Sequence, residues 1–160
     1  MLYREYYEAI YKFCFRMLGN HENAMDTTQE TFIKLYERMK GHVAEIENTR
    51  AWLYKVAGNL CVNILNTNKR RNEIGQIIEH KSIENATPEN ILIQNEKNKM
   101  VKQAIQKLNK DQRLLVLMYQ DGLSYLEMAE ASGINPNSVG KTLWRVIDKL
   151  SETLKIRNHE

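Results

Sequence analysis

Apolar residues recur at three- and four-residue steps through most of the chain, which is the period of amphipathic α-helices. The first such stretch predicts a helix closed by Gly19, with core positions Leu2, Tyr6, Ile10, Phe13 and Met17. Asn20 can cap a second helix that continues to about residue 39. Its expected core positions are Met25, Thr28, Phe32, Leu35 and Met39.

The opposite face of this second helix is acidic and carries one exposed aliphatic residue. Its members are Asp26, Gln29, Glu30, Ile33 and Glu37. Charged residues at helical spacing most often form a solvated face. The more specific interpretation is an acidic docking surface for another protein. This helix alone does not decide between a solvated face and a docking surface.

After a predicted loop, Asn48 or Thr49 can cap a third helix over residues 50–71. Its expected core positions are Trp52, Leu53, Val56, Leu60 and Ile64. One outer strip carries Lys55, Asn59, Asn63, Asn66 and Arg70. Such amides can hydrogen-bond bases and sugars, while the cations Lys69, Arg70 and Arg71 neutralise phosphates. The alternative is a solvated face that ends in cations complementing the helix dipole.

The helical period fails from residue 73 to about residue 89, where a polar run with Pro88 indicates a linker. Helical spacing resumes near residue 90, and Asn109 or Asp111 can cap a strongly apolar helix. Only two prolines and seven glycines in 160 residues favour a mostly helical protein. We therefore predict an all-α fold of two small domains, residues 1–73 and 91–160, joined by a flexible linker over residues 74–90.

The stretch over residues 121–150 predicts two helices joined by a tight turn. Gly122 can end the preceding helix, Ser124 and Glu127 form a capping box, and Gly133 supplies the turn before Asn135-Pro136. The second helix has a buried stripe of Val139, Leu143, Val146 and Leu150. Its open side carries Asn137, Ser138, Lys141, Thr142 and Arg145. This arrangement is typical of a helix-turn-helix that reads a major groove, although a plain helical hairpin has the same pattern.

Composition narrows the range of functions. A net charge of +3 permits a nucleic-acid partner without requiring one. Cys14 and Cys61 lie in apolar helical patterns without metal-ligand spacing, so we expect buried thiols in a reducing cytoplasm. No secretory signal or membrane span is expected. We expect no metal, cofactor or catalytic residue, because nucleophile–base pairs, nucleotide-binding glycine loops and inward Glu-x-x-His pairs are not found in the sequence.

Three motifs in order resemble the extracytoplasmic-function sigma factors, the small promoter-specificity subunits of bacterial RNA polymerase. They are AMDTTQETF (24–32), RAWLYKVAGNLCVNIL (50–65), and the helix-turn-helix preceded by LNKDQRLLVLMY (108–119). The resemblance implies one domain for the polymerase core and the downstream promoter element, and another for the upstream element. It also implies an inhibitory anti-sigma partner, anchored in the membrane.

The resemblance assigns roles to the three polar faces. Asp26, Gln29, Glu30 and Phe32 match a D-x-x-Q-E-x-F motif on the helix that docks on the clamp coiled coil of the polymerase's largest subunit. Residues on the minus-ten helix would be Lys55, Asn59, Asn63, Lys69, Arg70 and Arg71. Residues on the minus-thirty-five helix would be Ser138, Lys141, Thr142 and Arg145.

The recognition helix departs from the common family pattern. Gly140 and Thr142 stand where common members have Lys and Arg, and we expect Gly140 to leave room for the DNA backbone. The alternative to a sigma factor is an autonomous helix-turn-helix regulator. A weaker alternative is a helical interaction protein without a DNA role.

Overall fold

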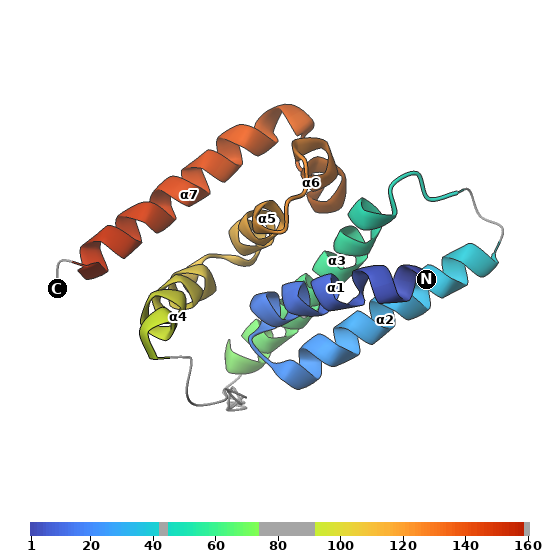
Figure 1. Ribbon diagram of the computed structural model, residues 1–160, viewed down its shortest axis with the longest axis horizontal. Coiled ribbons are helices and arrows are strands. Elements are labelled where there is room, and N and C mark those ends of the chain that lie inside the picture. Colours follow the sequence, from blue (N-terminus) through green and yellow to red (C-terminus); the bar gives the residue numbers. More distant parts are fainter. Residues whose placement is uncertain (42–44, 74–91, 159–160) are drawn as a thin grey trace.

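The computed structural model describes residues 1–41, 45–73 and 92–158, and within those ranges it contains helices and no strands (Figure 1). The predicted all-α fold is therefore confirmed. The helices are α1 (Leu2–Leu18), α2 (His21–Lys40), α3 (Thr49–Glu73), α4 (Leu92–Lys107), α5 (Lys110–Gln120), α6 (Tyr125–Ser132) and α7 (Pro136–Asn158). The predicted linker, residues 74–90, lies outside the described residues.

The predicted helix ends are confirmed by backbone geometry and hydrogen bonds. Gly19 and Gly133 close α1 and α6 in the left-handed conformation, with φ of 70° and 78°. The Asn20 side chain accepts from the Asn23 amide at the start of α2. In the capping box, the Ser124 hydroxyl accepts from the Glu127 amide at 3.1 Å, and the Glu127 carboxylate accepts from the Ser124 amide at 3.0 Å. These ends are set locally, by residues within three positions of each other.

The structure decides two helix caps for which the sequence offered two candidates each. Asn48 caps α3, because its Oδ1 accepts from the Ala51 amide at 3.0 Å. Asn109 caps α5 in the same way, accepting from the Gln112 amide at 2.8 Å. In both cases the cap is the amide residue immediately before the helix.

The predicted core stripe of α2 is wrong at both ends. Met25 and Met39 are exposed, at 36% and 60%, whereas Thr28, Phe32 and Leu35 are buried as expected. The remaining core positions are taken by Ala24, Thr27 and Thr31. The threonine hydroxyls of Thr28 and Thr31 donate to main-chain carbonyl oxygens one turn back, at 2.6 and 2.8 Å. Thr28 and Thr31 thus satisfy their hydroxyls within the helix and can pack in the core, whereas the buried Thr27 hydroxyl has no hydrogen-bond partner among the described residues.

The predicted core stripe of α3 also needs correction. Leu53 is buried, but Trp52, Val56, Leu60 and Ile64 are only partly buried. The buried positions are Ala51, Leu53, Tyr54, Ala57, Gly58 and Cys61. The reason is that α3 packs on two sides, against α1 and α2 on one and against α5 and α6 on the other. Cys14 and Cys61 are buried free thiols, as predicted.

The two halves of the molecule share one apolar core. Helices α1–α3 form one group and α4–α7 the other, and α1 and α3 both contact α5 (Figure 1). Gly58 permits the closest approach, because a Cβ placed there would lie 2.8 Å from Leu114 Cδ1. A side chain at this position would require the Leu114 side chain to move.

A buried guanidinium joins the ends of two helices at this boundary. Arg113 of α5 donates to the Met17 carbonyl oxygen at the end of α1, at 2.7 Å. It also donates to the carbonyl oxygens of Gln106 and Leu108 at the end of α4, at 2.7 and 3.3 Å. Burial lowers the pKa of Arg113. The last carbonyls of a helix have no partner within the helix, so one side chain supplies partners to both ends.

Replacing Arg113 by Met should therefore lower the free energy of unfolding by about 3 kcal/mol, because buried carbonyl oxygens lose their donor. Urea unfolding followed by circular dichroism would measure the change. Lys12→Met is the control, since it removes the exposed pair with Glu8 at 2.8 Å and leaves the core intact. An Arg113→Met midpoint equal to that of the control would show that water replaces the guanidinium.

Candidate polymerase and nucleic-acid interfaces

The acidic face, defined as Asp26, Gln29, Glu30 and Ile33, lies exposed along α2. Its orientation is set by the buried opposite side of the helix, where Phe32 lies edge-on to the Tyr3 ring at 5.1 Å between centroids. Glu30 makes a loose ion pair with Lys34 at 3.9 Å, with both side chains largely exposed. The carboxylates are thus available to a basic partner.

Sequence reasoning missed one member of this surface. Tyr36 is 66% exposed, and it stands three residues after Ile33, which is 57% exposed. Residues three apart are neighbours on a helix, so the two apolar side chains extend the acidic face toward the end of α2. The available signal was this spacing, because aromatic residues are enriched in protein–protein interfaces.

The amide strip, defined as Lys55, Asn59, Asn63, Lys69, Arg70 and Arg71, lies exposed on α3. Gly58 and Cys61 are buried between its members, which fixes which side of α3 meets solvent. The neighbouring Asn66 is only partly buried, and Lys110 of α5 donates to its side-chain oxygen. The structure therefore keeps the predicted strip together but engages Asn66 with the other half of the molecule.

The recognition face, defined as Asn137, Ser138, Lys141, Thr142 and Arg145, lies on the first three turns of α7. Thr142 is partly buried and the other four are exposed. The stripe beneath is confirmed, since Val139, Leu143 and Val146 are buried and Leu150 packs against the core. The first helix of the pair, α6, is held against α7 at its start. This is the arrangement of a helix-turn-helix.

The structure explains why a glycine stands at position 140, in a way that the sequence did not suggest. A Cβ at this position would lie 3.1 Å from Cε2 of Tyr125 on α6. The glycine thus leaves room for an aromatic ring of its own chain. Trp144, one turn further, is 68% exposed, so Tyr125 and Trp144 border the recognition face on the side of Gly140.

The three faces occupy different helices and do not converge on one cleft. The acidic face is on α2 and the amide strip on α3, whereas the recognition face is on α7 in the other group of helices (Figure 1). Extended surfaces on separate elements suit contacts with large partners. In the described ranges, His, Cys, Asp and Glu do not gather in threes to hold a metal ion.

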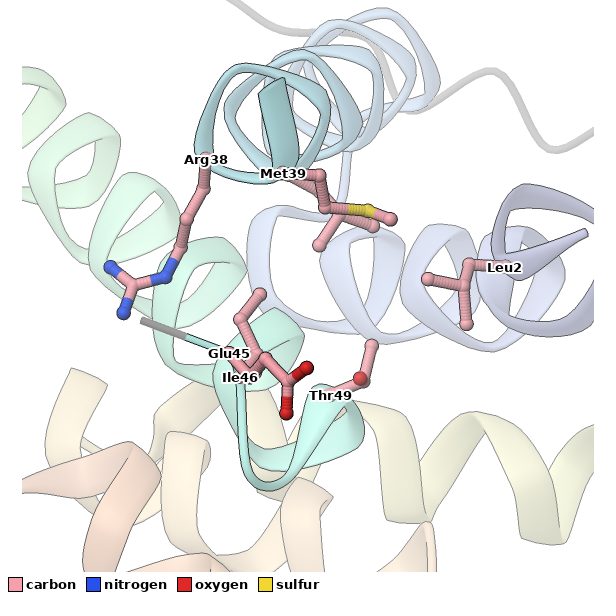
Figure 2. Close-up of a pocket in the computed structure, with 7 residues that line it drawn as sticks. Leu2, Arg38, Met39, Glu45, Ile46 and Thr49 are labelled. Carbon is pink, nitrogen blue, oxygen red and sulfur yellow. The ribbon is translucent and has the colours of Figure 1, made fainter. Parts of the chain in front are cut away.

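A pocket of about 330 Å³ lies where the end of α2 meets the start of α1 and residues 45–49 (Figure 2). Its lining combines apolar side chains with one guanidinium and one carboxylate. The lining residues are Leu2, Leu35, Arg38, Met39, Glu45, Ile46 and Thr49. Arg38 also lies over the Trp52 ring, 5.9 Å from its centroid, which holds the guanidinium beside α3. None of the predicted site residues lines this pocket.

None of the helices, over the residues that the structure describes, combines the length and apolar character that a membrane span requires.

The chain matches two models of known protein families. The model described as Sigma-70 region 2 matches residues 2–71, and the model described as Sigma-70, region 4 matches residues 98–152. The first match contains the acidic face and the amide strip, and the second contains the recognition face. Proteins of this family are transcription initiation factors and not enzymes.

Several curated proteins are similar over nearly the whole chain. RNA polymerase sigma factor YlaC of Bacillus subtilis is 30% identical over 99% of this chain and 94% of its own length. ECF RNA polymerase sigma factor SigW of the same organism is 29% identical over 94% of this chain and 85% of its own. ECF RNA polymerase sigma factor BldN of Streptomyces coelicolor is 26% identical, and the chain spans 59% of its length.

A solved structure has the same fold. The sigma factor RpoE, in complex with the anti-sigma factor NepR from Bartonella quintana, matches with a TM-score of 0.72 over 96% of this chain and 94% of its own, at 24% identity. Together with the two family matches and the curated relatives, this shows that the chain belongs to the sigma-70 family of RNA polymerase sigma factors, in its extracytoplasmic-function group.

Proposed function

We propose that this sigma factor binds polymerase core through the acidic face and directs it to promoters that the amide strip and the recognition face read. In this proposal residues 1–73 serve the core and the minus-ten element, and residues 91–160 serve the minus-thirty-five element. Residues 74–90 link the two. The observation that carries the proposal is that each predicted set lies along one helix opposite a buried stripe, with all its members exposed except the partly buried Thr142.

The side-chain chemistry of each of the three faces suits a different partner. Carboxylates beside Ile33 and Tyr36 suit a basic protein surface with an apolar centre. Amides and cations on α3 suit a separated DNA strand, since amides hydrogen-bond base edges and cations neutralise phosphates. Lys141 and Arg145 suit guanine edges or phosphates in a major groove.

An anti-sigma factor is the proposed regulator. The structural neighbour RpoE is bound to the anti-sigma factor NepR, and its fold matches this chain over nearly all of its length. We place the protein in the bacterial cytoplasm, where polymerase and promoters are found. A membrane anchor on the inhibitor would hold this complex at the membrane until a signal releases it.

Reversing the acidic face tests the docking role. Asp26→Lys/Glu30→Lys should weaken binding to purified core polymerase by about tenfold or more, because like charges would meet across the interface. Pull-down and fluorescence titration would measure it. Glu5→Lys/Glu8→Lys, which changes two exposed carboxylates of α1, is the charge-matched control. Equal losses in both variants would mean that net charge, not the acidic face, governs binding.

Removing a cation tests the recognition face. Arg145→Ala should weaken promoter binding by the holoenzyme by roughly 1–3 kcal/mol if its side chain meets a base or phosphate. Lys155→Ala, an exposed cation further along α7, should have a smaller effect. Gel-shift titrations at several salt concentrations would compare them. Unchanged binding and transcription with Arg145→Ala would remove this residue from the site.

Removing an amide from α3 tests the minus-ten role. Asn59→Ala should impair open-complex formation more than initial promoter binding, because the amide would contact bases only after strand separation. Permanganate footprinting and gel shift would measure the two steps. A promoter with mismatched bases over the melted segment should recover most of the loss. Equal losses in both steps would assign Asn59 to initial docking alone.

A further inference from the structure

The chain has two cysteines, and the fold brings both to one place in its core. Cys14 is on α1 and Cys61 is on α3, and these two helices pack against each other. Both residues are fully buried, at 0% exposure. We propose that Cys14 and Cys61 form a reversible oxidation site, in which hydrogen peroxide converts the two thiols into an intramolecular disulfide. The site lies apart from the three faces described above, so the proposal goes beyond the proposed function.

The two thiols contact each other where α1 packs on α3. The Cys61 thiol donates a hydrogen bond to the Cys14 sulfur, and the Thr28 hydroxyl of α2 makes a second hydrogen bond with that sulfur. A disulfide joins cysteines whose Cβ atoms lie only about 4 Å apart, so two sulfurs in contact need little more than side-chain rotation to form one. The whole of α2 separates the two cysteines in the sequence, so the fold alone pairs them.

The hydrogen bond gives the two thiols different roles. Receiving it lowers the pKa of Cys14, because the bond stabilises the thiolate, and this effect outweighs that of burial. Donating it, together with burial, raises the pKa of Cys61, which stays protonated. The thiolate is the nucleophile in thiol oxidation. Cys14 is therefore the sulfur that reacts with the oxidant, and Cys61 is the sulfur that closes the disulfide.

The reaction with hydrogen peroxide has two steps. The Cys14 thiolate attacks one peroxide oxygen, the O–O bond breaks and hydroxide leaves, which gives a sulfenic acid at Cys14. The Cys61 sulfur then attacks the Cys14 sulfur, so that the S–O bond breaks and the S–S bond forms. The two thiol protons leave with the peroxide oxygens in two molecules of water. Two electrons thus pass from the thiols to the peroxide.

Burial makes the two steps differ in rate. Because both sulfurs are fully buried, peroxide contacts Cys14 only when the packing opens locally, and the first step is slow. The second step needs no access from solvent, because Cys61 is already in contact with the oxidised sulfur. The sulfenic acid is therefore consumed before a second peroxide arrives. Oxidation stops at a disulfide, which thiols can reduce, instead of continuing to an irreversible acid.

The disulfide ties together the helices that carry the acidic face and the amide strip. It joins α1 to α3 and closes a loop that contains the whole of α2. A cross-link across a long loop restricts the unfolded chain more than the folded one, so it stabilises the fold. On α3, Cys61 stands between Asn59 and Asn63 of the amide strip. Oxidation therefore makes this part of the protein harder to unfold.

Mass spectrometry of the peroxide-treated chain tests the site directly. The reaction is stopped with catalase, and the chain is then unfolded in urea with N-ethylmaleimide. We expect wild type to lose two hydrogens, to take up no N-ethylmaleimide, and to yield a tryptic product that joins the Cys14 and Cys61 peptides. Dithiothreitol should restore both thiols. Two free thiols in the folded protein, after a treatment that fully oxidises the same chain in urea, would overturn the proposal.

Two serine variants separate the roles of the thiols. Cys61→Ser keeps a hydroxyl that can donate to Cys14 but cannot form the disulfide, so the Cys14 sulfenic acid should persist and react with dimedone. Cys14→Ser leaves only the protonated Cys61, which should take up dimedone at least about tenfold more slowly. Cys61→Ala and Cys14→Ala, which bring no hydroxyl into the core, replace these variants if circular dichroism shows a loss of helix. Equal labelling of the two would contradict the assigned roles.

Urea unfolding of oxidised and reduced protein completes the test. The midpoint should rise on oxidation of wild type, and it should stay unchanged in Cys14→Ala treated in the same way. A midpoint that does not rise in wild type would overturn the stabilising role. A disulfide between two molecules, or a sulfenic acid that accumulates in wild type, would overturn the intramolecular site.

Discussion

The structure depends on how the ends of α1 and α4 are satisfied where the two domains meet. Helix ends leave carbonyl oxygens without partners, and here both ends are turned toward protein. Arg113 donates to Met17 of α1, to Gln106 in the last turn of α4 and to Leu108 just after that helix. The Gln106 side chain donates to the Arg16 carbonyl oxygen at 2.8 Å. The last turn of the N-terminal domain's first helix is therefore completed by residues of the C-terminal domain.

In the helix-turn-helix, too, one side chain serves two parts of the structure. Glu127 is needed locally to start α6, and a carboxylate in that position has acceptor sites to spare once it has bound the Ser124 amide. Arg50 of α3 uses those sites, since its Nε and Nη2 donate to Glu127 Oε2 and Oε1 at 3.1 and 3.2 Å. Glu127 therefore has two roles: it caps α6, and it contacts the N-terminal domain. One carboxylate thus couples the start of α6 to the placement of the C-terminal domain.

Local features of this protein could be predicted from its sequence, and features of its packing could not. Helix caps such as Asn20 and Ser124 depend on residues three positions apart, and they were predicted correctly. The core stripes of α2 and α3 were not, because threonines such as Thr28 bury well once their hydroxyls are satisfied, and because α3 packs on two sides. The polar faces were predicted because each lies opposite a buried stripe. Tyr36 and Trp144 were missed because exposed apolar residues resemble core in a hydropathy pattern.

The contact between the two groups of helices could not be predicted from the sequence for a related reason. Its polar part joins residue types that also occur on solvated helix faces. Tyr54 of α3 donates to Asp121 Oδ2 at 2.7 Å, and Arg16 of α1 pairs with Asp121 Oδ1 at 3.3 Å. An apolar contact accompanies these polar ones, because Leu114 of α5 packs directly against Gly58 of α3, and no local pattern reveals a pairing of residues so far apart in the chain.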